Sequence, residues 1–429
     1  MNGLWGDEPD GENDIAVIRV ADFERSSSSV GLDKLTYRSI TRKERQSRLI
    51  KSGDLLIEKS GGGEKTLVGC VVLFAHEFDA VTSNFVARMR PLSEFDSRFL
   101  CYAFGNLYRG RVNYPSVKQV TGIQNLDAES YLQERFCFPS RVEQAQIARF
   151  LDHETARIDA LIKEQQRLIE LLKEKRQAVI SHALTKGLDP TVPMKDSFVG
   201  WLGGVPAHWD VGALRWYSTI QGGVAKGKDY EGRETVLMPY LRVANVQSGF
   251  VDLSEIKEIS VLESEVERYS LRAGDVLMNE GGDSDKLGRG TVWREQISPC
   301  LHQNHVFAIR PNSSLKAEWL AVFTQSEQAR NYFFLNSKQS TNLASISASN
   351  VMGLALPIPP VEEQQDILAY LDKDLARHES LISVAVSTVE LLQERRSALI
   401  SAAVTGEIDV SGWQPVVCAQ SLELEQEAV

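Results

Sequence analysis

One helical sequence occurs twice in this chain of 429 residues. The stretch IELLKEKRQAVISHALTKGLD (169–189) returns 220 residues later as VELLQERRSALISAAVTGEID (389–409). The wider blocks 152–189 and 372–409 align without a gap, and 16 of their 38 positions are identical. Unrelated sequences of ordinary composition would share roughly two or three positions. The chain therefore contains an internal repeat.

The repeat extends well upstream of the helical blocks. The segment FPSRVEQAQIARFLD (138–152) matches IPPVEEQQDILAYLD (358–372), and GDLLIEKSGGGEKTLVG (53–69) matches GDVLMNEGGDSDKLGRG (274–290). The helical blocks keep one offset, whereas the upstream matches drift by a few residues, as loops with small insertions would. Since the period is far longer than the roughly 20–50 residues of solenoid repeats, each unit is a domain followed by a helix.

The two parts of each unit differ in their pattern of apolar residues and of Gly and Pro. Short apolar runs between Gly-rich breaks, such as DIAVIRV and LVGCVVLF, predict the strands of a mixed α/β (α+β) domain. Residues 141–186 and 361–405 contain neither Gly nor Pro, which predicts helices roughly 70 Å long. We therefore expect a first domain at 1–140, followed by a helix at 141–186 and a linker at 187–208. A second domain at 209–358 is followed by a second helix at 359–406 and a C-terminal tail at 407–429.

Apolar residues recur every three or four positions along both helices. A stripe with this period packs against another helix, and we expect the two copies to pack against each other. The residues predicted for this helix-pair interface are Leu151, Ile158, Leu161, Leu168, Leu172 and Val179 in the first helix and Leu371, Leu381, Leu392 and Leu399 in the second. Ile162 and Ile169 flank the stripe and widen it.

Composition restricts the class of protein only weakly. The five cysteines are scattered, which is typical of a reducing compartment, and no apolar run approaches the roughly 18 residues that span a bilayer. A cytoplasmic location is expected. The net charge of −11 weighs against nucleic-acid binding. However, acidic residues concentrate at the two ends of the chain, and the charged residues of 38–51 are all basic except Glu44. The net charge therefore does not exclude a local basic surface.

The repeated blocks resemble a known family. Two different α/β domains, each followed by a long helix that opens with Glu-Gln shortly after a proline (139–152 and 359–372), are similar to the specificity subunit of type I restriction–modification systems. The paired GDLLI and GDVLM segments and the shared ELL, R, A, I and S positions of both helices add to this resemblance, which covers nearly the whole chain.

The resemblance implies a division of labour. Each globular part would be a target recognition domain that reads one half of a bipartite double-stranded DNA site. The helices would form an antiparallel coiled coil that sets the spacing, in a pseudo-two-fold tandem repeat. This chain would be non-catalytic and bind no cofactor. Two modification (methyltransferase) subunits would bind S-adenosylmethionine, and restriction (translocase and nuclease) subunits would use ATP and Mg²⁺.

Two other functions were weighed from the residues. A helical protein–protein scaffold without DNA specificity stays open. A stand-alone nuclease or methyltransferase is disfavoured, because GGGEKT (61–66) has Glu64 where a phosphate-binding loop needs Gly, and no N-P-P-aromatic motif occurs. Cys300, His302 and His305 have the spacing of metal ligands. However, the residues at the equivalent positions of the first repeat, here called their twins, are Ala80, Thr82 and Phe85. We therefore expect no metal site and expect His305 to fill an apolar strand position.

Candidate DNA contacts come from twin positions and from one basic cluster. Lys65 and Lys286 share a place in the Gly-rich loops, where glycine lets the backbone approach phosphate, although such a loop can equally be a solvated turn. Lys118 and Lys338 form a second twin pair. The remaining candidates are Arg109, Arg111, Asn113 and Ser60.

The two domains differ at their start. HWDVGALRWYSTI (208–220) precedes the second domain and has no counterpart before the first, since Met1 falls almost at the equivalent of Gly222-Gly223. Either GWQPVV (412–417) supplies the missing strand, or the recorded sequence starts late.

Overall fold

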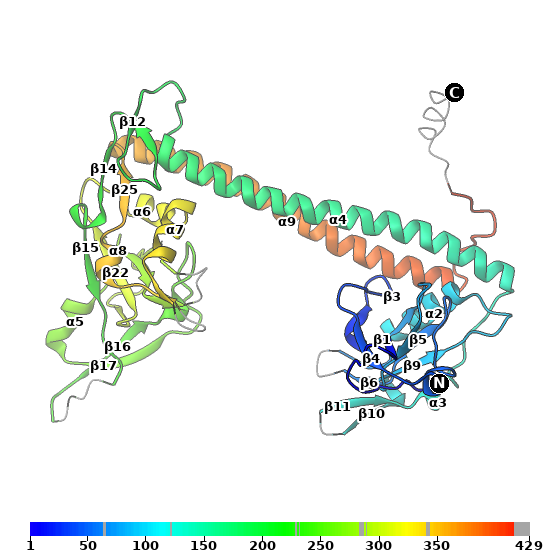
Figure 1. Ribbon diagram of the computed structural model, residues 1–429. Coiled ribbons are helices and arrows are strands. Elements are labelled where there is room, and N and C mark those ends of the chain that lie inside the picture. Colours follow the sequence, from blue (N-terminus) through cyan, green and yellow to red (C-terminus); the bar gives the residue numbers. More distant parts are fainter. Residues whose placement is uncertain are drawn as a thin grey trace, which may run out of the picture. The chain divides into compact units, whose positions relative to one another are not determined.

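The computed structural model describes residues 1–62, 66–120, 122–227, 230, 232–282, 287–288, 290–339 and 344–415. They form two compact units, Met1–Gln166 with Ser387–Val429, and Arg167–Val386. Each unit contains one α/β domain and one half of each of two long helices (Figure 1). The chain is a tandem repeat in which each mixed α/β domain is followed by one long helix, and the two helices are antiparallel within each unit.

The first domain is built from three small sheets. The largest has the strand order β2-β3-β7-β5-β9, the second β4-β1-β8 and the third β10-β11-β6. These strands are Asp14–Ile18 (β1), Phe23–Glu24 (β2), Ser29–Val30 (β3), Thr36–Ser39 (β4), Leu55–Glu58 (β5), Ser60–Gly61 (β6), Val71–Leu73 (β7), Ala80–Thr82 (β8), Val86–Met89 (β9), Val117–Val120 (β10) and Ile123–Leu126 (β11). The α-helices of this domain are Arg42–Arg45 (α1), Ser97–Arg109 (α2) and Ala128–Tyr131 (α3).

The second domain repeats this plan with additions. Its sheets have the orders β15-β22-β18-β20, β17-β16-β21, β19-β24-β23 and β14-β25. The strands are Asp210–Ala213 (β14), Ser218–Gly222 (β15), Val236–Leu241 (β16), Lys257–Val261 (β17), Val276–Asn279 (β18), Gly281–Gly282 (β19), Gly290–Val292 (β20), Leu301–His302 (β21), Val306–Pro311 (β22), Lys338–Gln339 (β23), Ala344–Ser345 (β24) and Ala355–Ile358 (β25). The helices are Glu263–Tyr269 (α5), Ala317–Phe323 (α6), Glu327–Leu335 (α7) and Ala348–Val351 (α8). The segment expected to be only a linker contains the hairpin Met194–Asp196 (β12) and Gly204–Pro206 (β13).

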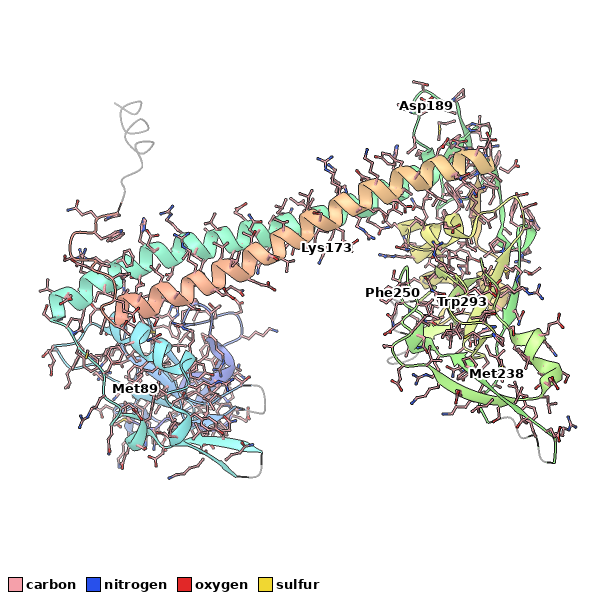
Figure 2. The ribbon with its side chains drawn as sticks, turned by 180° about the vertical axis from the view of Figure 1, so that it is seen from behind. Met89, Lys173, Asp189, Met238, Phe250 and Trp293 are labelled. Atoms are coloured by element: carbon pink, nitrogen blue, oxygen red, sulfur yellow. The ribbon has the colours of Figure 1, made fainter. Side chains whose placement is uncertain are left out.

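The cores form around twin strands. Strand β5 (LLIE) is buried along its whole length, and its twin β18 (VLMN) is buried except at Asn279. Continuous apolar runs of this kind are buried on both faces of a sheet. In the second domain β18 contributes Leu277 to a cluster that also holds Trp293 (Figure 2).

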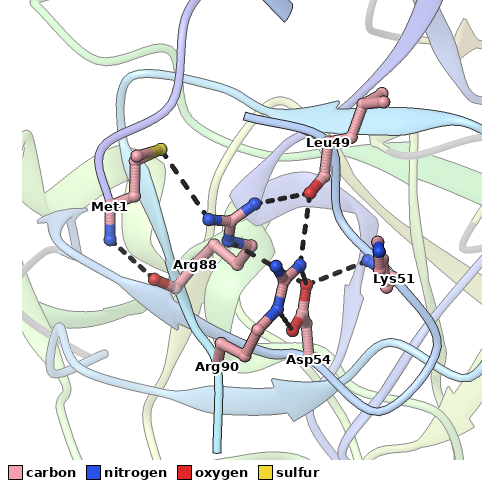
Figure 3. Close-up of polar contacts among 6 residues, drawn as sticks. All are labelled: Met1, Leu49, Lys51, Asp54, Arg88 and Arg90. Atoms are coloured by element: carbon pink, nitrogen blue, oxygen red, sulfur yellow. Dashed lines mark hydrogen bonds and ion pairs between the residues drawn. The ribbon is translucent and has the colours of Figure 1, made fainter. Parts of the chain in front are cut away.

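A buried ion pair occupies the same place in both domains. Arg90 donates to both carboxylate oxygens of Asp54 at 2.7 and 2.6 Å (Figure 3), and Arg310 does the same to Asp275 at 2.7 Å each. Both aspartates are almost fully buried, and removal of one partner from a buried ion pair costs roughly 3–5 kcal/mol. In the first domain the loss should be smaller, because Arg88 also lies 3.9 Å from Asp54. The pair therefore anchors the strand β9 or β22 in each copy.

The long helices are Arg141–Lys186 (α4) and Val361–Val404 (α9). Each ends at a glycine with positive φ, Gly187 or Gly406, the usual left-handed cap. No helix in the described ranges is long and apolar enough to cross a membrane.

The Glu-Gln blocks tie each helix to its domain. The buried side chain of Gln144 accepts from the backbone N–H of Asp96 at 2.9 Å and donates to the carbonyl of Pro139 at 2.9 Å. Its twin Gln364 accepts from Lys316 at 2.9 Å and donates to Pro359 at 2.8 Å. A side-chain amide suits this place because it both accepts and donates a hydrogen bond.

The helices pack antiparallel in each unit. In the first unit Leu151 shares a cluster with Ile400, and Arg396 pairs with Asp159 at 2.9 and 3.2 Å. In the second unit Leu184 shares a cluster with Leu371. The start of each helix thus lies against the end of the other.

The seam differs in part from the predicted stripe. Leu151, Ile158 and Leu371 are buried, and Leu172, Val179, Leu392 and Leu399 are half-buried. Leu161, Leu168 and Leu381 are 49%, 43% and 46% exposed, so their assignment to the interface is wrong. The half-buried residues next to them in sequence are Ile162, Ile169 and Ile382. At these places the next residue of the buried stripe is four positions along the helix, whereas we predicted three. The sequence did not decide between the two, because both adjacent positions hold an apolar residue.

The first domain retains a trace of the strand that it was expected to lack. Asn2 forms an isolated bridge to Ala87, and this bridge has the same register as the pair between Gly222 and Phe307 in the second domain. Residues 412–415 are not in a strand, and Trp413 packs edge-on against Phe150 and His153 of α4. Residues 416 and 417 lie outside the described ranges.

The seam generates a stability prediction. Replacement of Leu371 by Ala should lower the free energy of unfolding by roughly 2–5 kcal/mol, because the side chain is 1% exposed and its loss leaves a cavity. The matched change Leu381→Ala should cost less than about 1 kcal/mol. Urea unfolding of both variants measures the difference. Equal losses would show that the seam runs through both positions.

A buried histidine makes the second domain sensitive to acid. His302 is fully buried, its Nδ1 donates to the carbonyl of Val306 at 2.7 Å and its Nε2 has no partner. Burial lowers the pKa of His302. The unfolded histidine takes up a proton near pH 6.5, whereas the folded one does so only at lower pH. The free energy of unfolding of this domain should therefore fall as the pH drops below about 6.5.

The measurement compares thermal unfolding at pH 7.5 and 5.5. The variant His302→Thr, which installs the residue of the twin position Thr82, should lose less stability between these two pH values than the natural chain. The same loss in both would rule out His302 as the cause.

Candidate nucleic-acid interface

Each domain carries one small three-stranded sheet beside its Gly-rich loop. In the first domain Lys118 pairs across β10 and β11 with Asn125, which pairs with Ser60 of β6. In the second domain Lys338 pairs with Ser345, which pairs with Gly281 of β19. Cross-strand partners point to the same face of a sheet. The fold therefore brings together Ser60 and Lys118, which the sequence separates by 58 positions.

Polar side chains of the first sheet are linked to one another. Ser60 Oγ donates to Asn125 Oδ1 at 2.6 Å, and Lys118 Nζ pairs with Asp127 at 2.9 Å. The Lys118 side chain is nevertheless 72% exposed, so its charge is available to a phosphate that displaces Asp127. This sheet lies at the end of the first domain away from the helices (Figure 1).

The loops that follow β6 and β19 contain the other twin lysines. Lys65 and Lys286 lie outside the described residues. The described start of the first loop requires glycine at Gly62, because its φ is +66° and a Cβ there would lie 2.7 Å from the side-chain oxygen of Gln124. The backbone at this place is thus held close to β11.

The basic cluster after α2 is divided by the fold. Asn113 is fully buried and donates to the carbonyl of Val68 at 2.6 Å, so the expectation that it faces DNA is wrong and its role is structural. Arg111 is exposed in a turn with φ of +54°. Arg109 lines a hollow beside Arg396 of α9. Burial and the neighbouring Arg396 both lower the pKa of Arg109. Neither arginine is part of the small sheet.

A surface hollow beside the small sheet was missed from the sequence. Its apolar walls are Trp5, Phe85 and Ile123, and its polar walls include Ser60 and Asn84. The three apolar side chains are 37%, 46% and 50% exposed. Single exposed apolar residues are common, but several around one hollow mark a binding surface. The signal in the sequence was Phe85. We interpreted it as an apolar strand position, but in the structure it lies in the turn between two strands.

The same error affected the twin of Phe85. His305 was expected in an apolar strand position, yet its side chain is 56% exposed and its Nδ1 bonds to Glu280 at 2.7 Å. Cys300 and His302 are buried in the core. Among the described residues no group of three or more His, Cys, Asp or Glu is placed to hold a metal ion.

Comparisons with known proteins agree with this architecture. Residues 218–380 match the family model of the type I restriction modification DNA specificity domain. The specificity subunit of the type I restriction enzyme EcoKI from Escherichia coli K12 is 24% identical over 370 residues, covering 85% of this chain and 76% of that relative. The StySPI specificity subunit from Salmonella potsdam is 23% identical with the same coverage.

Solved structures share the fold. A chain from a type I restriction–modification system superposes with a TM-score of 0.68 at 15% identity, covering 95% of this chain and 96% of the other. The HsdS subunit from Thermoanaerobacter tengcongensis superposes with a TM-score of 0.53 at 16% identity, covering 95% of each chain.

Two unlike reading domains on an antiparallel helix pair define a tandem DNA-specificity protein. Over most of its length the chain is similar to specificity subunits of type I restriction–modification systems, and residues 218–380 match the DNA specificity domain of that family.

The small sheets yield a prediction about salt. Lys118→Ala and Lys338→Ala should each weaken DNA binding about equally for all sequences, because a lysine on phosphate contributes affinity without base readout. Each should lower the slope of log K against log salt by roughly 1. Lys173→Ala, on the exposed side of α4 (Figure 2), should leave the slope unchanged. Titrations at several salt concentrations measure this, and equal slopes for all three variants would exclude the small sheets as phosphate contacts.

Proposed function

We propose that this chain is the DNA-binding specificity subunit of a type I restriction–modification complex and recognises a bipartite double-stranded DNA sequence. Each α/β domain reads one half of the site. The observation that carries the proposal is the duplicated small sheet, which repeats the same backbone pairing in both domains with different side chains. A repeated frame with unlike side chains suits a site with two unlike halves.

The helix pair is proposed to set the spacing between the halves. Both helices run without interruption through the boundary between the two units. Antiparallel copies of one helix would let the two domains read the two halves of one site, as the subunits of dimeric DNA-binding proteins read their half-sites. The gapless alignment of the helical blocks fits this role, because an insertion there would change the spacing.

The partners follow from the family. We propose that the chain itself is not catalytic and recruits two modification subunits, which bind S-adenosylmethionine, and restriction subunits, which use ATP and Mg²⁺. Leu161, Leu168 and Leu381 on the helices are about half exposed, and such leucines suit contacts with partner helices. We propose that the complex works in the cytoplasm.

Single-molecule methylation sequencing tests the function. DNA from cells that express this chain with its modification subunits should carry a methylated motif with two defined halves and a fixed gap. Cells with the modification subunits alone are the control and should lack the motif. The absence of any new motif, with the modification subunits shown to be active alongside another specificity subunit, would favour a protein–protein scaffold instead.

A further inference from the structure

The two domains place different side chains on one shared backbone frame. The N–H of Lys59 donates to the carbonyl of Phe85 at 2.8 Å, and the N–H of Glu280 donates to the carbonyl of His305 at 2.9 Å. The N–H of Leu126 donates to the carbonyl of Lys59 at 2.8 Å, and the N–H of Ile346 does so to Glu280 at 2.8 Å. Positions 59 and 85 are therefore the structural equivalents of 280 and 305.

These positions lie where the small sheet, the Gly-rich loop and the preceding turn meet. Position 59 directly precedes β6, and position 280 directly precedes β19. Ser60 also donates its backbone N–H to the carbonyl of Phe85 at 3.3 Å. A ligand that contacts Ser60 therefore comes close to Phe85, because both line one surface hollow.

In the first domain these two positions hold one aromatic and one basic residue, Phe85 and Lys59. Phe85 forms a wall of the surface hollow with Trp5 and Ile123. Lys59 stands beside it and donates from Nζ to Asn2 at 3.0 Å. Apolar side chains in a DNA-reading surface contact the methyl group of thymine in the major groove.

In the second domain the two equivalent positions hold an acidic residue, Glu280, and a histidine, His305. Glu280 accepts from His305 at 2.7 Å, and the two side chains are 33% and 56% exposed. A carboxylate is repelled by phosphate, so a glutamate on a DNA-facing surface suits a base edge that donates a hydrogen bond. The exocyclic amine of cytosine is such a donor, and glutamate is its usual acceptor.

We infer that positions 59 and 85 of the first domain, and 280 and 305 of the second, are specificity-determining. The Phe85 hollow accepts a thymine methyl in one half-site, and the Glu280–His305 pair accepts the amine of a cytosine in the other. This inference rests on the proposed function, and it identifies which side chains read bases.

An identical neighbour provides the control. Asn84 and Asn304 occupy the same twin position directly before Phe85 and His305. Asn84 is a polar wall of the Phe85 hollow. Because both domains keep the same residue, it cannot account for a difference between the two half-sites, and its loss should weaken binding without exchanging one base for another.

The test exchanges the readers between the domains in the full chain. The double variant Lys59→Glu/Phe85→His is expressed with the modification subunits, and its methylated motif is sequenced beside that of the natural chain. We expect one thymine position of one half-site to accept cytosine, while the other half and the gap stay unchanged. The reverse exchange, Glu280→Lys/His305→Phe, should alter only the other half.

Two further variants keep the outcome decisive. Phe85→Leu retains an apolar side chain and should keep the natural motif. Asn84→Ala should lower the methylated fraction of all sites without changing their sequence. An unchanged motif in both exchange variants would overturn the inference, as would loss of methylation at every site by both, since an exchange of readers predicts a new motif rather than none. If the natural chain itself yields no bipartite motif, the proposed function fails instead.

Discussion

The burial of one helix seam against its own repeat is the constraint on which the rest of the structure depends. Neither α4 nor α9 could hide its apolar stripe alone, and each unit contains the start of one helix packed on the end of the other. Because the copies are antiparallel, the start of each helix lies against the end of the other within each unit. The buried glutamines Gln144 and Gln364 then fix each domain to the start of its helix through both the amide N–H and the oxygen.

The two domains share a backbone framework but carry different side chains on their proposed DNA-binding surfaces. The ion pairs Arg90–Asp54 and Arg310–Asp275 keep the central strands in place in both copies. The small sheets keep one register while their side chains differ, with Ser60 in one domain and Gly281 in the other. Stability and specificity thus depend on separate residues, which lets the half-sites diverge without loss of the fold.

Much of the architecture could be predicted from the sequence, because the repeat and the Gly- and Pro-free runs are long-range signals that do not depend on packing detail. The helices, their pairing and the mixed α/β domains follow from them. The exact seam did not, since Leu161 and Ile162 both suit a helix stripe and only packing decides between them. The site was harder still. Asn113 reads as a polar surface residue but is buried against Val68, and Phe85 reads as core but lies in an exposed turn. The type of a single polar or aromatic residue does not reveal whether its side chain is buried or exposed, because that depends on residues distant in the sequence.

The measurement that tests the central claim most directly is the length of the gap after the helices are shortened. Deletion of seven residues from each helix, within the pair, keeps the seam in phase and removes about 10 Å of helix, which corresponds to roughly three base pairs. Methylation sequencing should then report the same two half-site sequences separated by a gap that is shorter by about that amount. Altered half-sites with an unchanged gap would contradict the account, because the domains and not the helices would then set the spacing.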